Sequence, residues 1–569
     1  MLLEHIELLL LQRYDRSACE GDVASLAIGF VGKYYSRIRG HSKNGDSLLF
    51  SGGEVDIAQE EQRILLDTYR MTRAREIGGE WLCWQAVEEL GIRRFLEGTC
   101  GWAAPDVDVL LMNLLGRLLY PVSEHKTELW LKETSGGADL LGGTVGLGED
   151  ALHRVNVKLL GEHHRLEEHI YNRADELLGF GERRFLYDLT NTYFEGRMLG
   201  SGLAQFGRSK EKRSDCRLVS ISLLTNDLGF IKRSDFHAGN VSEPATFSDV
   251  VALAGGAGIL TDAGIGTAAN LAQAALQGVP YMCVVREGFA GYQVGFEQAE
   301  AFDHEPSNGS SPYKVWVKVV GHAFSAGGKT FADRLIFVKS EMKMNKEVAM
   351  LQRQKQRMEQ GLETIRAGLS KPKGQKTIKQ VNERIGRLKQ GNSSVARAFD
   401  ITLQQGDADI SAIHWTYDAA IEKEKGVYVI RTSFEVPSAR EGWEMYHTIT
   451  NIETVNRCCK TDLNIRPVYH QKDQTIKSHL LLTLLACSVV SFIRFKLAKK
   501  GINWAWKEVV RVMNTQKAMF SEFKNAQQEL ILLSQWTYPE PKARSVYQAM
   551  NYAEIRNPAF FFKVGFKDP

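Results

Sequence analysis

The stretch FLYDLTNTYFEG, residues 185–196, is the segment of this 569-residue chain from which the fold is predicted. Its first half is typical of a buried strand, and a single acid, Asp188, lies among the apolar residues. An unpaired carboxylate in an apolar strand costs several kcal/mol unless a metal ion or another cation meets it. We therefore expect a cationic partner opposite Asp188.

The residues that follow predict alternating strands and helices. Two runs in RLVSISLLTNDLGFIKRSDF (217–236) flank the turn signal NDLG, which indicates a hairpin. Next come a helix near 245–254, a buried strand GILTDAG ending at Asp262, a helix AANLAQAALQG capped by Gly278, and a strand VPYMCVVRE. This β-β-β-α-β-α-β order predicts a mixed sheet, and Asp188 and Asp262 meet at one sheet edge if their strands are neighbours.

Composition places only loose limits on function. The formal net charge is +3, so any surface that binds nucleic acid must be local. The eight cysteines are scattered without CxxC pairs, which favours reduced thiols in the cytoplasm and argues against structural zinc.

The N-terminal run MLLEHIELLLLQRYD contains acids and no cleavage pattern, so no signal peptide is expected. The apolar segment 480–493 is shorter than the ~20 residues of a membrane-spanning helix and predicts a buried core helix.

Residues 290–437 depart from this pattern. The strands YKVWVKVV, RLIFVKS and KGVYVIRTSF surround a long helical stretch, and residues 341–390 contain 13 Lys and Arg against 5 Asp and Glu. A solvated helical arm and a surface that faces phosphates both explain this charge, and the sequence leaves the two open. The candidate phosphate contacts are Lys371, Lys373, Lys376 and Lys379.

A second helix near the C-terminal third carries charged residues on one face. Ser438 and Glu441 have the spacing of a capping box and predict a helix through EGWEMYHTITNIETVNRCCK (441–460). At about 100° per residue, four residues share one stripe of that helix: Tyr446, Glu453, Arg457 and Lys460. A phosphoryl-transfer site explains this composition, because metal ions need carboxylates and a cleaved backbone needs cations and hydroxyls. The alternative is a set of surface acids, since strand-end acids also cap turns.

Taken in order, these blocks resemble the bacterial insertion-sequence transposases of the DDE class. YDLTNTYFEG resembles their first-acid strand, and GRSKEKRSDCRLVSISLLTNDLGF resembles the GxSK block and the hairpin after it. LTDAGIGTAANL resembles the second-acid block, and YHTITNIETVNRCCKTDLNIRPVYHQKDQTIKSHLLLTLLA the third-acid region with its YREK box. GGEWLCWQAVEELGIRRFLEG is more faintly similar. Ile449 stands where the YREK box has arginine.

The resemblance implies a ribonuclease H-like α/β fold with a helical N-terminal region. An inserted domain, β-rich and helical, accounts for the 191 residues between Asp262 and Glu453. Asp188, Asp262 and Glu453 are implied as catalytic ligands of two Mg²⁺ ions, for which Mn²⁺ can substitute. The implied function is cleavage and transfer of strands at the inverted-repeat ends of an insertion sequence. The implied partner is double-stranded DNA, which the chain binds as a homodimer. The implied location is the bacterial cytoplasm, at the nucleoid, and no membrane is expected to be a partner.

Further residues are expected to contact the DNA backbone. Tyr446 and Lys460 are expected to hold phosphates beside the cut. Arg286, at the end of the VVRE strand, is a weaker candidate for DNA contact, and an ordinary surface arginine is the alternative. Arg457 is expected to bind the phosphate that Ile449 cannot bind, or else to pair with a neighbouring acid. Two rival functions stay open: a metal-dependent nuclease of the same fold that cuts without joining, and a DNA-binding protein derived from a transposase with an inactive site.

Five parts of the chain are expected. Residues 1–150 form an accessory region that is a candidate for DNA-end binding, and residues 151–289 begin the catalytic domain. Residues 290–437 are the inserted domain, residues 438–500 complete the catalytic domain, and residues 501–569 form a C-terminal region.

Overall fold

The computed structural model describes residues 64–141, 147–181, 184–285, 295–296, 298–306, 311–406, 409–423, 425–554 and 560–564. The chain forms two compact units, each described by itself below. Unit 1 takes its described residues from Met1–Arg183, Asp188–Val241 and Thr450–Pro569, and unit 2 takes them from Arg184–Tyr187 and Ser242–Ile449. The N-terminal run, in which no signal peptide is expected, and Arg286, the candidate DNA contact, both lie outside the described residues.

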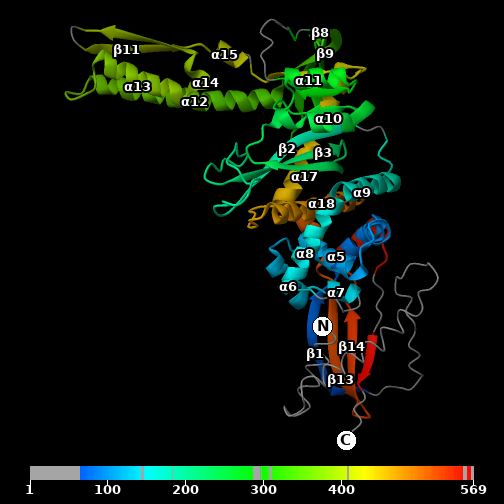
Figure 1. Cartoon of the computed structure of the whole chain (residues 1–569). Helices are drawn as coiled ribbons and strands as arrows, with labels where there is room; N and C mark the ends of the chain where they lie inside the picture. Colours follow the sequence, from blue (N-terminus) through cyan, green and yellow to red (C-terminus); the bar gives the residue numbers. More distant parts are fainter. Residues whose placement is uncertain are drawn as a thin grey trace. The chain divides into compact units, whose positions relative to one another are not determined.

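Unit 1 contains helices packed around one apolar helix, α18 (Asp473–Lys499). Its neighbours, coloured blue, cyan and red in Figure 1, are α3 (Gly78–Glu89), α5 (Ala104–Leu119), α8 (Glu149–Leu159), α9 (His163–Leu178) and α20 (Pro541–Met550). By length and composition α18 could cross a membrane, but 72% of its apolar window is buried inside the protein. The prediction of a buried core helix at 480–493 is therefore confirmed.

Two groups of strands also belong to unit 1. An antiparallel sheet has the order β1 (Ile64–Glu76), β13 (Lys517–Asn525), β14 (Leu530–Trp536), β15 (Phe560–Val564). The other group is the part of β2 (Phe185–Tyr193) from Asp188 onward, β3 (Leu218–Asn226) and β4 (Ile231–Ala238), with β3 next to both. The β3–β4 hairpin turns where NDLG predicts it: Asn226 Oδ1 accepts from the backbone of Leu228 at 3.1 Å and of Phe230 at 2.9 Å, and Gly229 has φ +85°.

The sheet of unit 2 is mixed. Residues 185–187 of β2 pair in parallel with β5 (Ile259–Thr261), and β5 pairs in parallel with β6 (Tyr281–Val284). The helices α10 (Ser248–Ala254) and α11 (Ala268–Leu276) supply the crossovers, so the predicted β-β-β-α-β-α-β order is confirmed. Four strands from the segment expected to be inserted extend this sheet in antiparallel pairs beyond β6: β12 (Val427–Thr432), β9 (Lys329–Ser340), β8 (Tyr313–Ala326) and β7 (Glu300–His304).

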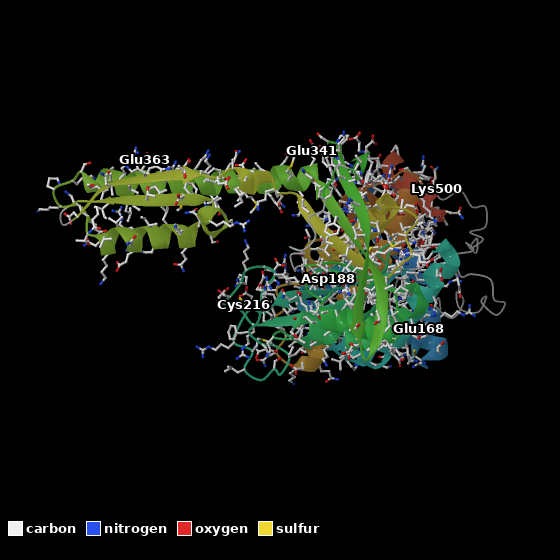
Figure 2. All side chains as sticks on the ribbon, turned by 90° about the horizontal axis from the view of Figure 1, so that it is seen from above. Glu168, Asp188, Cys216, Glu341, Glu363 and Lys500 are labelled. Atoms are coloured by element: carbon white, nitrogen blue, oxygen red, sulfur yellow. The ribbon has the colours of Figure 1, made fainter. Side chains whose placement is uncertain are left out.

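The long helical stretch forms a subdomain of unit 2 with its own core. Helix α12 (Glu341–Leu369) packs on α13 (Ile378–Gly391) and on the hairpin of β10 (Phe399–Gln405) and β11 (Ile410–Tyr417), as Figure 1 shows. In Figure 2 α12 runs from Glu341 outward past Glu363. Buried apolar residues recur along α12 at Leu351, Met358 and Leu362, and this stripe meets the apolar faces of α13 and the hairpin. We call this subdomain, residues 341–417, the basic arm.

The predicted helix through 441–460 is interrupted. Its start is confirmed, because Ser438 Oγ caps α16 (Ala439–His447) by accepting from the backbone of Glu441 at 3.1 Å. A turn at residues 448–449 then separates α16 from α17 (Thr450–Arg457), and a short π-helix, Cys458–Asp462, follows.

The prediction of one continuous helix is therefore wrong. At the break, Thr448 Oγ1 donates to the carbonyl of Met445 at 2.8 Å, and three successive β-branched residues, 448–450, lose side-chain freedom in a helix. Angles taken around a single helix axis consequently do not relate Tyr446 to the residues of α17.

Candidate functional site

Asp188 faces protein donors on both of its carboxylate oxygens. The Lys210 ammonium lies 3.2 Å from Oδ1, and the Asn456 side-chain amide donates to Oδ2 at 2.9 Å. The Asp188 side chain is 16% exposed, so a cation near it offsets much of the cost of its burial. The expected cationic partner is therefore present, and within the described chain it is a lysine. Figure 2 labels Asp188 among the surrounding side chains.

The loop that carries Lys210 is attached to the same strand as Asp188. Asn191 of β2 donates to the carbonyl of Arg208 at 3.0 Å and accepts from the backbone of Lys210 at 3.2 Å. Ser209 Oγ accepts from the backbone of Glu211 and of Arg213, both at 3.1 Å. These bonds hold the backbone of residues 208–213 and so place the Lys210 side chain beside Asp188.

An open pocket of about 300 Å³ surrounds these residues in unit 1. It is lined by Asp188, Thr190, Lys210, Glu453, Asn456, Arg457, Lys460, Thr461 and Arg466. Glu453 is exposed, and no hydrogen bond or ion pair joins it to a described residue. The pocket thus combines two carboxylates with cations and neutral polar groups.

A further carboxylate, Glu211, forms ion pairs with two of the cations that line the pocket. Lys460 Nζ lies 2.9 Å from Glu211 Oε1, and the Arg466 guanidinium contacts the same oxygen. The hydrogen bond from Arg466, with that from Lys460, lowers the pKa of Glu211 from 4.5 to about 2. Lys460, predicted to hold a phosphate, is therefore paired with an acid here.

Arg457 has its side chain in the same pocket. It is exposed and forms no ion pair with any residue in the described ranges. The neighbouring acid Asp462 is half-buried, and burial raises its pKa despite the positive charges of Arg494, Lys507 and Arg457. The alternative role for Arg457, an ion pair that steadies the helix, is thus not seen.

Asp262 and Tyr446 lie in unit 2. Asp262 directly follows β5, and its Oδ1 accepts from the backbone of Gly264 at 2.8 Å and of Ile265 at 3.1 Å. One oxygen therefore caps a turn, as the structural alternative predicts for a strand-end acid. Burial raises the pKa of the Tyr446 hydroxyl, and the charges of Cys283 and Asp262 raise it further. Tyr446 is thus close enough to Asp262 to sense its charge, although it does not line the pocket around Asp188.

Comparison with known families identifies the type of protein. Residues 200–489 match the family described as transposase DDE domain. The chain belongs to this family. The matched range includes Asp262 and Glu453 and begins after Asp188. The mixed α/β arrangement is consistent with a ribonuclease H-like transposase. No protein with a curated description matches the chain.

The candidate DNA contacts of this transposase that lie in the basic arm are surface residues. We call Lys371, Lys373, Lys376 and Lys379 the arm lysines. They lie between the end of α12 and the first turn of α13, and all are exposed except the half-buried Lys376. Among the described residues none of them forms an ion pair, which leaves their charges available to an external anion.

Three groups of acids and histidines in the described part of the transposase lie close enough to share a metal ion. The most buried group is Glu124, His470 and His479. Here Arg117 Nη2 lies 3.3 Å from His479 Nδ1, and because arginine only donates, Nδ1 must accept and Nε2 carries the proton. Neither nitrogen of His479 then offers a free lone pair to a metal. The charges of Arg117 and Glu124 instead compensate each other, and burial lowers the pKa of His479 to about 4.

The sequence of the transposase did not predict that four further residues lie around Asp188, namely Lys210, Glu211, Asn456 and Arg466. The first two belong to the GRSKEKR block that carries part of the family resemblance, but nothing in their spacing indicates which acid each would contact. Asn456 lies one helical turn from both Glu453 and Lys460, so a polar side chain on that face is the only local signal.

Proposed function

We propose that this transposase binds the inverted-repeat ends of an insertion sequence, cleaves DNA strands there and joins them to a target. The observation that supports this most is the pocket in which Glu453 and Asp188 lie together with Lys210, Arg457 and Arg466. Carboxylates are the ligands that Mg²⁺ prefers, and cations beside them suit a phosphodiester backbone. An enzyme of this family acting on DNA requires that combination of groups.

Asp188, Asp262 and Glu453 are the proposed ligands of two Mg²⁺ ions. Glu453 suits this role because it has no partner among the described residues, and Asp262 keeps one oxygen outside the turn that it caps. Asp262 is included because it lies in the LTDAGIGTAANL block, which resembles the second-acid block of the family, and directly follows strand β5. When bound, such ions activate water or a 3′-hydroxyl and stabilise the leaving 3′-oxygen.

The other side chains are proposed to hold DNA. Arg457 provides a planar guanidinium that can bind two phosphate oxygens, which compensates for Ile449 in the YREK box. Lys460 would contact phosphate after exchange from Glu211, and Tyr446 would position the backbone near Asp262. The arm lysines would bind DNA away from the cut. Residues 1–150 are proposed to assist DNA-end binding, and a homodimer to hold two ends.

Substitution of the three acids tests the proposal. Asp188→Asn, Asp262→Asn and Glu453→Gln should each abolish Mg²⁺-dependent strand cleavage by the purified full chain, because each removes a ligand charge with little change in volume. Asp249→Asn and Glu444→Gln, exposed acids on α10 and α16, serve as matched controls and should leave cleavage intact.

The products separate the rival functions. The substrate is a duplex that carries the sequence flanking the reading frame, and both nicked and joined products are measured. Cleavage that persists in one acid variant would remove that residue from the site. Nicks without joined product would indicate a nuclease, and DNA binding without any Mg²⁺-dependent cutting would indicate an inactive derivative.

A further inference from the structure

Lys210 contacts the carboxylate that is proposed to bind metal. Its ammonium lies 3.2 Å from Asp188 Oδ1 and also donates to the carbonyl of Leu189. Asn456 donates to the second oxygen of Asp188 at 2.9 Å. Glu453, in the same pocket, has no hydrogen bond or ion pair with a described residue. Asp188 thus has two protein donors, of which Lys210 is the charged one, whereas Glu453 has none among the described residues.

The contact between Lys210 and Asp188 is supported by the backbone around it. Asn191 lies three residues along β2 from Asp188. Its side chain hydrogen bonds to the backbone of Arg208 and of Lys210, the two neighbours of Ser209, and so fixes the position from which the Lys210 side chain extends. Lys212 on the same loop is exposed and makes no ion pair with a described residue. A lysine side chain in this loop therefore does not contact an acid merely because of its place in the loop, and the contact of Lys210 with Asp188 is specific to its position.

The charges of the pocket make Lys210 distinct from its cationic neighbours. Lys460 and Arg466 share the single negative charge of Glu211, whereas Lys210 is the cation at Asp188 itself. A divalent ion bound to Asp188 would bring two positive charges within a few ångströms of the Lys210 ammonium. Like charges at that separation repel strongly, so metal and ammonium compete for the same carboxylate.

We propose that Lys210 takes the place of the metal charge at Asp188 in the metal-free chain and moves to a phosphate oxygen of the DNA backbone when a divalent ion binds. This inference rests on the proposed function through the assignment of Asp188 as a metal ligand. Its consequence is that metal and DNA bind cooperatively. With DNA the displaced ammonium gains a phosphodiester, which lowers the cost of displacing it from Asp188.

Titration of Mn²⁺ into the DNA-free full chain, followed by the paramagnetic resonance signal of the free ion, tests the competition. Lys210→Met should bind Mn²⁺ about tenfold more tightly than the wild type, because the competing charge is gone. Lys212→Met is the matched control and should bind as the wild type does. Unchanged or weaker binding by Lys210→Met would overturn the inference. A thermal melt in chelator reports folding, and Lys210→Gln replaces the methionine variant if that one is unfolded.

Asp188→Asn in the same titration separates this inference from the proposed function. If it loses Mn²⁺ binding while Lys210→Met behaves as the wild type, Asp188 is a ligand and only the role of Lys210 fails. If Asp188→Asn binds Mn²⁺ normally, the ligand assignment fails and the inference fails with it.

The transfer to phosphate has its own readout, the salt dependence of binding to a duplex of arbitrary sequence. In Ca²⁺, Lys210→Met should lower the slope of log affinity against log salt by about 0.9, the value for one phosphate contact. In chelator the slope should equal that of the wild type, because Lys210 is then held by Asp188. An equal reduction in both conditions, or none in either, would refute the exchange.

Discussion

Glu211→Gln is expected to destabilise unit 1 in a pH-dependent way. The substitution keeps the volume of the side chain and removes the charge that pairs with Lys460 and Arg466. In the folded chain the pKa of Glu211 falls from 4.5 to about 2. Since one pKa unit corresponds to about 1.4 kcal/mol, these partners favour the ionised carboxylate by at most about 3.5 kcal/mol. The side chain is 26% exposed, so solvent screening reduces the expected loss at pH 7 to about 1–2 kcal/mol.

The sign of the pH effect follows from the direction of the shift. A carboxylate with a lower pKa in the folded than in the unfolded chain stabilises the fold fully above the unfolded value, near 4.5. That contribution declines as the pH falls from there toward 2. The stability difference between wild type and Glu211→Gln should therefore be largest at pH 7, similar at pH 6, and clearly smaller at pH 4.

Urea unfolding of the metal-free chain measures this difference. The unfolding of unit 1 is followed at pH 7, 6 and 4 for wild type and Glu211→Gln, with Glu168→Gln as the control. Glu168 is an exposed acid of α9, labelled in Figure 2, and has no ion-pair partner among the described residues. A loss at pH 4 equal to the loss at pH 7, or no loss at pH 7, would show that Glu211 does not stabilise the pocket through its charge.

Two further predictions concern DNA contacts. Replacing the arm lysines together by glutamine should weaken DNA binding and lower the slope of log affinity against log salt by about 0.9 for each phosphate contact that the substitution removes; an unchanged slope would make the basic arm a solvated surface. Arg457→Ala should reduce the cleavage rate by roughly tenfold to a hundredfold, with Arg457→Lys retaining part of the rate, because a guanidinium binds phosphate in two places and an ammonium in one. The exposed Arg440→Ala on α16 is the control, and cleavage by Arg457→Ala at the wild-type rate would exclude a role for this side chain.

Local features of the fold were predictable from sequence. The turn at residues 226–229, the cap at Ser438 and the crossover helices depend on side chains within a few residues of the backbone that they stabilise. The core helix α18 was also predictable as an apolar helix, and its packing inside the protein shows that it is a core helix, although by length and composition it could cross a membrane. The break at Thr448 was missed although its cause is local, since a capping signal and a charged stripe favoured one long helix.

The partners of the acids were decided by tertiary structure. Sequence indicated that Asp188 needs a cation, but its two donors are 22 and 268 residues away, and Glu211 and Lys460 are 249 residues apart. Strand pairing and helix packing determine which of the many lysines contacts which carboxylate. Neither can be inferred from a side chain and its neighbours in the sequence. The strands β7, β8, β9 and β12 show the same limit: their residues predict strands, whereas the sheet they extend is determined by hydrogen bonds to backbone far away in the chain.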